Sequence, residues 1–227
     1  MTSSPRHRGL RSLAVVAVAG LLLSGCGGAR PGVAASVGDD DISLSEVDQD
    51  AALVCQALEP TLESPVPMSA ARAAILETLV QRTIGDQIAE EYGVEPSQSY
   101  RAGVSEQQAS LEAVPEETRA AALKYVTAGA YQRSVGEAAA EVELRADGVS
   151  APSVDQISAR AQDIVSQWPN DHEVVLDPRF GLEVVDGQIV ATDTAVSFGL
   201  SPAAAAGTAT EPDPVYAQSL PDSQRCG

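Results

Sequence analysis

The fold is decided by the stretch MSAARAAILETLVQRTIGDQIAEEY at positions 68–92. Apolar side chains such as Ile75, Leu79 and Ile88 recur at helical spacing, so they lie on one side of an α-helix. Gly93 follows as a helix end, because glycine readily adopts the left-handed conformation found there. The sequence therefore predicts one long amphipathic helix whose apolar side packs against other elements.

Further helices are predicted on both sides of this one. Ser43-Leu-Ser-Glu46 is a capping-box pattern, which supplies partners for the free N–H groups at a helix start. Pro115-Glu-Glu117 is also a typical start, since proline fits the first turn and acids complement the helix dipole. The predicted helical segments run from Ser43 to Pro60, from Ser97 to Ala113, from Pro115 to near Gly148, and from Ser153 to Pro169.

Short β-type runs lie at the two ends of this helical region. Val33–Val37 precedes it, and Glu173–Leu176 and Leu182–Val185 follow it. Asp186-Gly187 between apolar runs is typical of a hairpin turn. We expect a mainly α fold with a small β element formed by N- and C-terminal strands, occupying residues 33–190. The remainder, 191–227, is predicted to be an irregular tail because it has no periodicity.

The charge of the chain excludes one class of partner. Its 227 residues hold 14 Lys+Arg and 32 Asp+Glu, a formal net charge of -18, which repels nucleic-acid backbones. The chain has two histidines, His7 and His172, which are few for a catalytic triad or a histidine-based metal site. We therefore expect no enzyme activity, no cofactor, no metal and no nucleic-acid partner.

The first 25 residues are predicted to be a secretion signal. A basic start with Arg6, Arg8 and Arg11 precedes an apolar run that is too short to span a bilayer. Leu23-Ser-Gly-Cys26 resembles the lipobox of bacterial lipoproteins, in which the cysteine receives a diacylglycerol and the peptide is cut just before it. The resemblance implies lipidation of Cys26, a flexible tether over 26–32 and a location on the extracytoplasmic face of a membrane. The alternative is an ordinary signal peptide in which Cys26 is incidental.

Two cysteines remain after Cys26. Cys55 lies in the first predicted helix and Cys226 is next to last in the chain. In an oxidising compartment an even number of cysteines favours a disulfide, which here pins the C-terminal tail to the body. The alternative is two unrelated thiols, with Cys55 buried and Cys226 exposed.

A second distinctive segment is Asp177-Pro178-Arg179-Phe180-Gly181. We interpret it as a structural clasp between the C-terminal strands and the helical body. Arg179 pairs with a carboxylate on a helix, Phe180 packs, and Gly181 takes a conformation closed to other residues. The alternative is that Arg179 binds a ligand.

The overall pattern resembles the N-terminal chaperone domain of SurA-type periplasmic foldases. The similarity rests on the Val33-Ala-Ala-Ser-Val37 strand, on Ile42-Ser-Leu-Ser-Glu-Val-Asp48, and on the helix from Arg72 to Ile84 that continues to Tyr92-Gly-Val-Glu95. It covers roughly residues 33–145, with 172–185 supplying a closing strand. It implies a helical cradle that holds unfolded clients. This sequence has no free stretch long enough for the parvulin prolyl-isomerase domain of that family, so we expect no isomerase activity.

These observations together lead us to expect a lipid-anchored holdase. Its partners are unfolded or exported polypeptides, which it binds in an apolar groove between amphipathic helices, and the membrane through its anchor. The alternative is an adaptor lipoprotein that docks one folded partner in an envelope assembly.

Overall fold

The computed structural model describes residues 30–192, 201, 206–207 and 214–227. It confirms the predicted fold class, a mainly α protein with a small β element. Cys26 and the predicted signal over 1–25 lie outside the described residues. The described helices are α1 (Leu44–Leu58), α2 (Met68–Tyr92), α3 (Gln98–Ser110), α4 (Glu116–Ala146), α5 (Val154–Asp171) and α7 (Pro214–Ser219). The strands are β1 (Val33–Val37), β2 (Asp40–Ser43), β3 (Val66–Pro67), β4 (Val174–Leu176), β5 (Leu182–Val185), β6 (Gln188–Ala191) and β7 (Arg225–Cys226).

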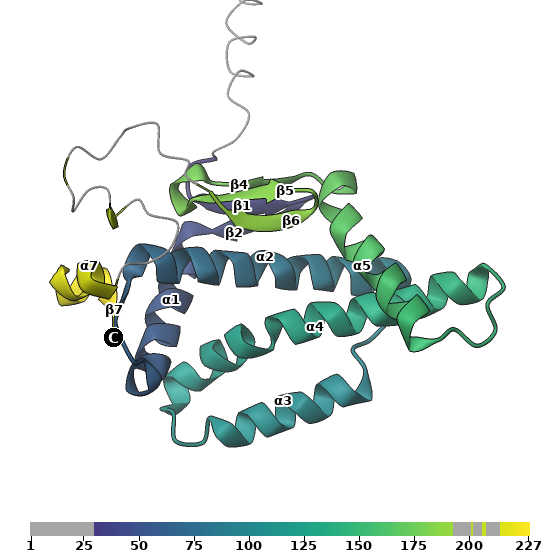
Figure 1. Cartoon of the computed structure of the whole chain (residues 1–227), viewed down its shortest axis with the longest axis horizontal. Coiled ribbons are helices and arrows are strands. Elements are labelled where there is room, and N and C mark those ends of the chain that lie inside the picture. The colour runs from purple at the N-terminus through teal and green to yellow at the C-terminus, as the bar shows by residue number, and fades with distance from the viewer. Residues whose placement is uncertain (1–29, 193–200, 202–205, 208–213) are drawn as a thin grey trace, which may run out of the picture.

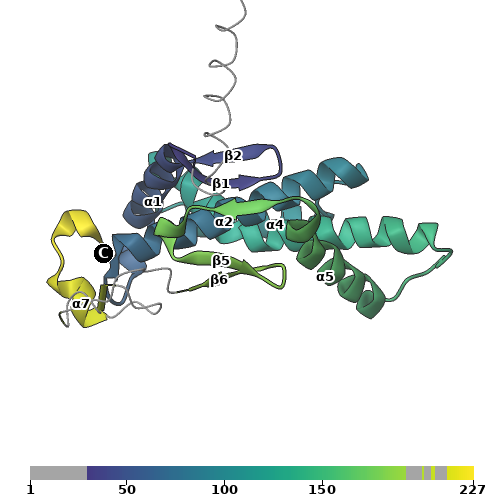
Figure 2. The ribbon, with the colours of Figure 1, turned by 90° about the horizontal axis from the view of Figure 1, so that it is seen from above.

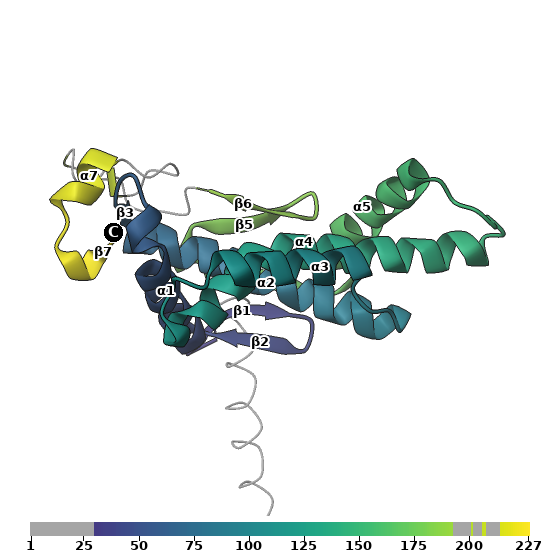
Figure 3. The ribbon, with the colours of Figure 1, turned by 90° about the horizontal axis from the view of Figure 1, so that it is seen from below.

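The elements are stacked in layers around α2. Figure 1 shows β1, β2, β4, β5 and β6 lying along one side of α2, with α4 on the other side and α3 beyond α4. Seen from below, α3 runs next to α4, with α2 behind them (Figure 3). The helix α1 crosses one end of this stack (Figure 1).

The main sheet joins the two ends of the predicted domain. Its strand order is β2-β1-β4, and both pairings are antiparallel. The strand β1 is central, with Val37 opposite Asp40 on one side and Val174 on the other. The segment around 172–185 thus supplies the closing strand, as the sequence predicts.

The core lies on both sides of α2, because this helix is enclosed between the sheet and α4. Leu76, Val80 and Ile88 of α2 are 0% exposed, and so are Val37 of β1 and Val135 of α4. The two long helices approach closely where α2 has a glycine. A Cβ at Gly85 would lie 2.9 Å from the Tyr131 ring of α4.

The helix ends follow the sequence signals closely. The Ser43 hydroxyl accepts a hydrogen bond from the Glu46 N–H, and a complete capping box is present at Ser153. Gly93 ends α2 with φ of 60°, the left-handed conformation that glycine favours. One boundary differs from the prediction. The helix α5 continues past Pro169 to Asp171: proline removes one backbone hydrogen bond, and the His172 N–H still bonds to the Trp168 carbonyl beyond it.

The hairpin β5–β6 extends the strand layer beyond β4. Figure 2 shows it next to the main sheet, on the side opposite β2. Its turn is Asp186-Gly187, as the sequence predicts, and both residues have positive φ. Gly187 lies against α5, where a Cβ would be 1.6 Å from the Ser166 carbonyl oxygen.

The prediction of an irregular tail over 191–227 is wrong for residues 214–226. The helix α7 and a 3-10 turn precede β7, which pairs antiparallel with β3 inside the loop predicted between α1 and α2. A two-residue ladder between segments about 160 positions apart leaves no local periodicity in either of them. Pairing with a distant segment, and not local propensity, gives this tail its structure.

The last three residues of the predicted tether over 26–32 lie in the described part of the chain and contact the folded body. The Arg30 guanidinium donates to the Asp41 carboxylate at 2.6 Å, and the Gly32 carbonyl accepts from the Leu44 N–H at 2.9 Å. These contacts fix Arg30–Gly32 to β2 and to the start of α1.

Candidate functional site

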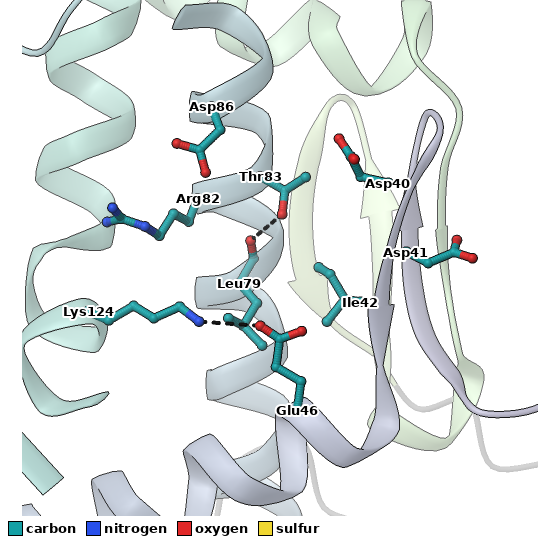
Figure 4. A pocket seen from close by; sticks show the side chains of 9 residues that line it. All are labelled: Asp40, Asp41, Ile42, Glu46, Leu79, Arg82, Thr83, Asp86 and Lys124. Atoms are coloured by element: carbon teal, nitrogen blue, oxygen red, sulfur yellow. Dashed lines mark hydrogen bonds and ion pairs between the residues drawn. The ribbon is translucent and has the colours of Figure 1, made fainter. Parts of the chain in front are cut away.

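An open pocket of about 490 Å³ lies between β2, α2 and α4. Figure 4 shows the side chains that line it, which come from these elements and from the first turn of α1. Ile42 and Leu79 supply its buried apolar surface, with exposed fractions of 5% and 4%. The polar and charged members of the lining are Asp40, Asp41, Glu46, Arg82, Thr83, Asp86 and Lys124.

Asp40 is held in place by a chain of hydrogen bonds that runs into the core. The Gln87 amide donates to the Asp40 carboxylate at 2.7 Å and to the Val37 carbonyl at 2.8 Å. The Gln87 oxygen accepts from the indole N–H of Trp168 at 2.9 Å. Trp168 is 4% exposed and belongs to the core. Gln87 therefore connects the β1–β2 hairpin to α2 and α5.

Asp86 is fixed by the phenol of a buried tyrosine. The Tyr131 hydroxyl donates to the Asp86 carboxylate at 2.5 Å. Burial of Tyr131, together with this bond, raises the pKa of the phenol well above its usual value. The Arg82 guanidinium lies over the face of the same ring, 4.5 Å from its centre, in a cation–π contact. The neutral Tyr131 thus positions one acidic side chain, Asp86, and one cationic side chain, Arg82, of the pocket.

Lys124 closes one side of the pocket from α4. Its ammonium group lies 3.4 Å from a Glu46 oxygen and 3.0 Å from an Asp50 oxygen. Asp41 differs from the other acids, since its side chain points away from α2 (Figure 4) and pairs with Arg30 and Ser36. The acids that face the pocket are therefore Asp40, Glu46 and Asp86.

The functional groups of the lining are carboxylates, two cationic side chains and one hydroxyl. The lining holds no cysteine, serine or histidine that would act as a nucleophile or a general base near neutral pH. Within the described residues, no group of three or more His, Cys, Asp or Glu side chains is placed to hold a metal ion. What the pocket offers is fixed carboxylates above a small apolar floor.

The pocket is not the apolar groove expected from the sequence, since charged groups dominate its lining. The exposed large apolar side chains of the described residues are valines on four different elements, at positions 126, 142, 154, 185 and 215. None of the residues predicted from the sequence as a site lines the pocket. The signal that the sequence offers is the acidic turn after β1, which contributes Asp40 and Asp41 to the lining.

The predicted cysteine pair lies at another end of the molecule. Cys55 of α1 and Cys226 of β7 are joined by a disulfide with their Cα atoms 5.3 Å apart. Both residues are buried, at 8% and 5% exposure. The bond fixes the C-terminal segment next to β3 and the start of α2 (Figure 1).

The segment predicted as a clasp contacts α2, but with a different pairing. Pro178–Phe180 form a 3-10 turn, Phe180 packs on the core, and Gly181 has φ of 63°. Arg179 pairs with Asp177 in its own turn at 2.6 Å, and not with a helix carboxylate as predicted. Asp177 is buried and also accepts from the Arg179 N–H, so the nearest acceptor is local. The Arg179 side chain is 66% exposed.

His172 is placed as a structural residue. Its ring stacks on Trp168 with centres 3.9 Å apart, and its Nε2 lies 3.5 Å from a Glu91 oxygen. His172 thus stacks on the indole that donates to Gln87, and Gln87 in turn donates to Asp40.

Comparison with known proteins gives no relative from which a function can be transferred. No protein-family model, curated protein or solved structure matches the chain. Among the described helices, none combines the length and the apolar character needed to cross a bilayer.

Proposed function

We propose that the protein is a lipid-anchored, extracytoplasmic holdase that binds extended segments of exported polypeptides and catalyses no reaction. The observation that carries this proposal is the open pocket beside β2, whose carboxylates are fixed in advance by Gln87 and Tyr131. Fixed acceptors around a small apolar floor suit reversible polypeptide binding, because little side-chain entropy is lost when a client docks.

The resemblance to SurA-type chaperone domains supports the same proposal. The pairing of β1 with β4 brings the two ends of the helical domain together, as that resemblance implies. The expected apolar groove is not part of the proposal. Binding instead uses the charged pocket and the strand at its rim.

The proposal is tested by client aggregation. The full chain is mixed at stoichiometric amounts with two reduced and alkylated, denatured clients, basic lysozyme and acidic α-lactalbumin, and light scattering is followed. A holdase slows the aggregation of at least one client. No effect on either client contradicts the proposal.

Crosslinking in cells separates this function from an adaptor that docks one folded partner. A holdase gives many crosslinked species, because its clients differ in length and sequence. One dominant species identifies an adaptor.

A further inference from the structure

The strand β2 forms one border of the pocket and is an edge strand. It pairs with β1 on one side, and in the described part of the chain no strand pairs with its other side. An edge strand presents unpaired N–H and C=O groups, which can take up a further strand from a bound peptide. Any segment added along β2 passes over the pocket, because Asp40, Asp41 and Ile42 belong to both.

The charges around this edge determine which kind of peptide segment binds there. Asp40 and Asp86 reach the pocket from β2 and α2. Each is hydrogen-bonded to a neutral group, Gln87 or Tyr131, so neither has its negative charge neutralised by that partner. Glu46, in contrast, already shares Lys124 with Asp50. Asp40 and Asp86 are therefore the carboxylates that face the pocket without an ion pair in the described part of the chain, while the Arg82 guanidinium, which lines the same pocket, lies over the Tyr131 ring.

The floor of the pocket suits a long side chain with a charged end. Ile42 and Leu79 contact the methylene stem of a lysine or arginine, and the carboxylates at the rim bind its charged group. A net charge of -18 on the whole chain adds a long-range attraction for basic segments. Pocket shape, rim charge and total charge thus favour the same occupant.

The geometry points to a binding site for extended cationic segments, which add to β2 as a strand and place one lysine or arginine between Asp40 and Asp86. This inference rests on the proposed holdase function and names its client class. The pairing along β2 gives affinity for any extended backbone, and the two carboxylates give the preference for basic side chains.

The test uses labelled peptides and the full chain in detergent micelles, with binding followed by fluorescence anisotropy. One peptide alternates valine and lysine, and a matched peptide alternates valine and glutamate. A third has the lysine sequence with every backbone nitrogen methylated, which removes the N–H donors of a strand. The lysine peptide is expected to bind, and the other two to bind on the order of tenfold more weakly or not at all.

Two double variants locate the site. In D40N/D86N, both asparagine oxygens still accept from Gln87 and Tyr131, so the fold is preserved while two charges are lost. In the control E106Q/E112Q, the same change of net charge is made at exposed positions outside the pocket. We expect the first variant to bind the lysine peptide about tenfold more weakly and the control to bind it as the wild type does. Equal circular dichroism spectra and Tm values show that both variants are folded.

The outcomes separate this inference from the function on which it rests. Equal weakening by both double variants, equal binding of the lysine and glutamate peptides, or full binding of the methylated peptide overturns the site. If the wild type and D40N/D86N suppress client aggregation equally, the holdase function stands and the β2 site is wrong. If the wild type suppresses no aggregation, the function itself is wrong.

Discussion

Gln87 shows how much a single side chain of this protein holds together. Its amide contacts the Val37 carbonyl, the Asp40 carboxylate and the Trp168 indole, which belong to three different elements. Replacing Gln87 by alanine leaves these groups without a partner. Because an unsatisfied partly buried polar group costs about 1–3 kcal/mol, we expect Gln87→Ala to lower the free energy of unfolding by about 2 kcal/mol. Urea denaturation measures the difference.

Gln81 of the same helix provides the control for this prediction. Within the described residues its amide bonds to Glu77 alone, one turn away. The change Gln81→Ala is expected to alter the free energy of unfolding by less than about 0.5 kcal/mol. Equal losses in the two variants would show that the Gln87 contacts carry no special weight.

Asp177 is predicted to make the stability depend on acid pH. Hydrogen bonds from the Arg179 side chain lower the pKa of its carboxyl below the ordinary value of 3.8. A folded-state pKa below the unfolded value stabilises the protein above pH 3.8, and this contribution is lost as the pH falls through the folded value. We expect Asp177→Asn to destabilise the protein by about 1–2 kcal/mol at pH 7, and the gap from wild type to close as the pH falls below 3.8 and through the folded-state pKa. Urea denaturation at several pH values tests this; a constant gap contradicts it.

The elements differ in how far sequence alone can predict them. The helices α1, α2 and α5 were predictable because their caps and apolar spacing are local properties. The ladder between β3 and β7 was not, since each strand has two residues and gains its structure only from the other. Between these cases lies β4, whose apolar run indicates a strand without showing that it pairs with β1.

The hairpin β5–β6 packs on α5 through Gly187, and this contact can be tested. A Cβ at Gly187 would overlap the Ser166 carbonyl, while its φ of 76° already disfavours other residues. Gly148 also has a positive φ, of 88°, but has open space around it. We expect Gly148→Ala to cost about 1 kcal/mol of unfolding free energy from backbone strain alone, and Gly187→Ala at least about 2 kcal/mol. Thermal denaturation of both variants measures the packing contribution as their difference.

At the scale of the whole molecule, the candidate site was beyond sequence reasoning for a physical reason. Asp40, Asp86 and Lys124 come from three elements and are separated by about forty positions at each step. Nothing in the neighbourhood of any one of them shows that the other two are near. In contrast, the two cysteines were predictable as a pair, because only two remain after Cys26.

The disulfide is predicted to stabilise the whole chain and not just its end. It closes a sequence separation of 171 residues, and removing such a bond costs about 2–5 kcal/mol. We expect Cys55→Ser/Cys226→Ser to lower the urea midpoint. Hydrogen exchange over 214–226 should also become faster, since β7 is then held by a two-residue ladder and by packing on α1 and α2 without a covalent link. A reducing agent should lower the midpoint of the wild type and leave the double variant unchanged. An unaltered midpoint in the variant contradicts the prediction.

The central position of β1 in its sheet determines when this protein can mature. Val37 lies opposite Val174, which is 137 positions later in the chain. When the chain emerges amino end first, β1 appears early. Its second partner, β4, appears only after nearly the whole helical body. The three-stranded sheet is therefore completed only when most of the chain has emerged. A stalled or truncated product is left with one edge of β1 unpaired.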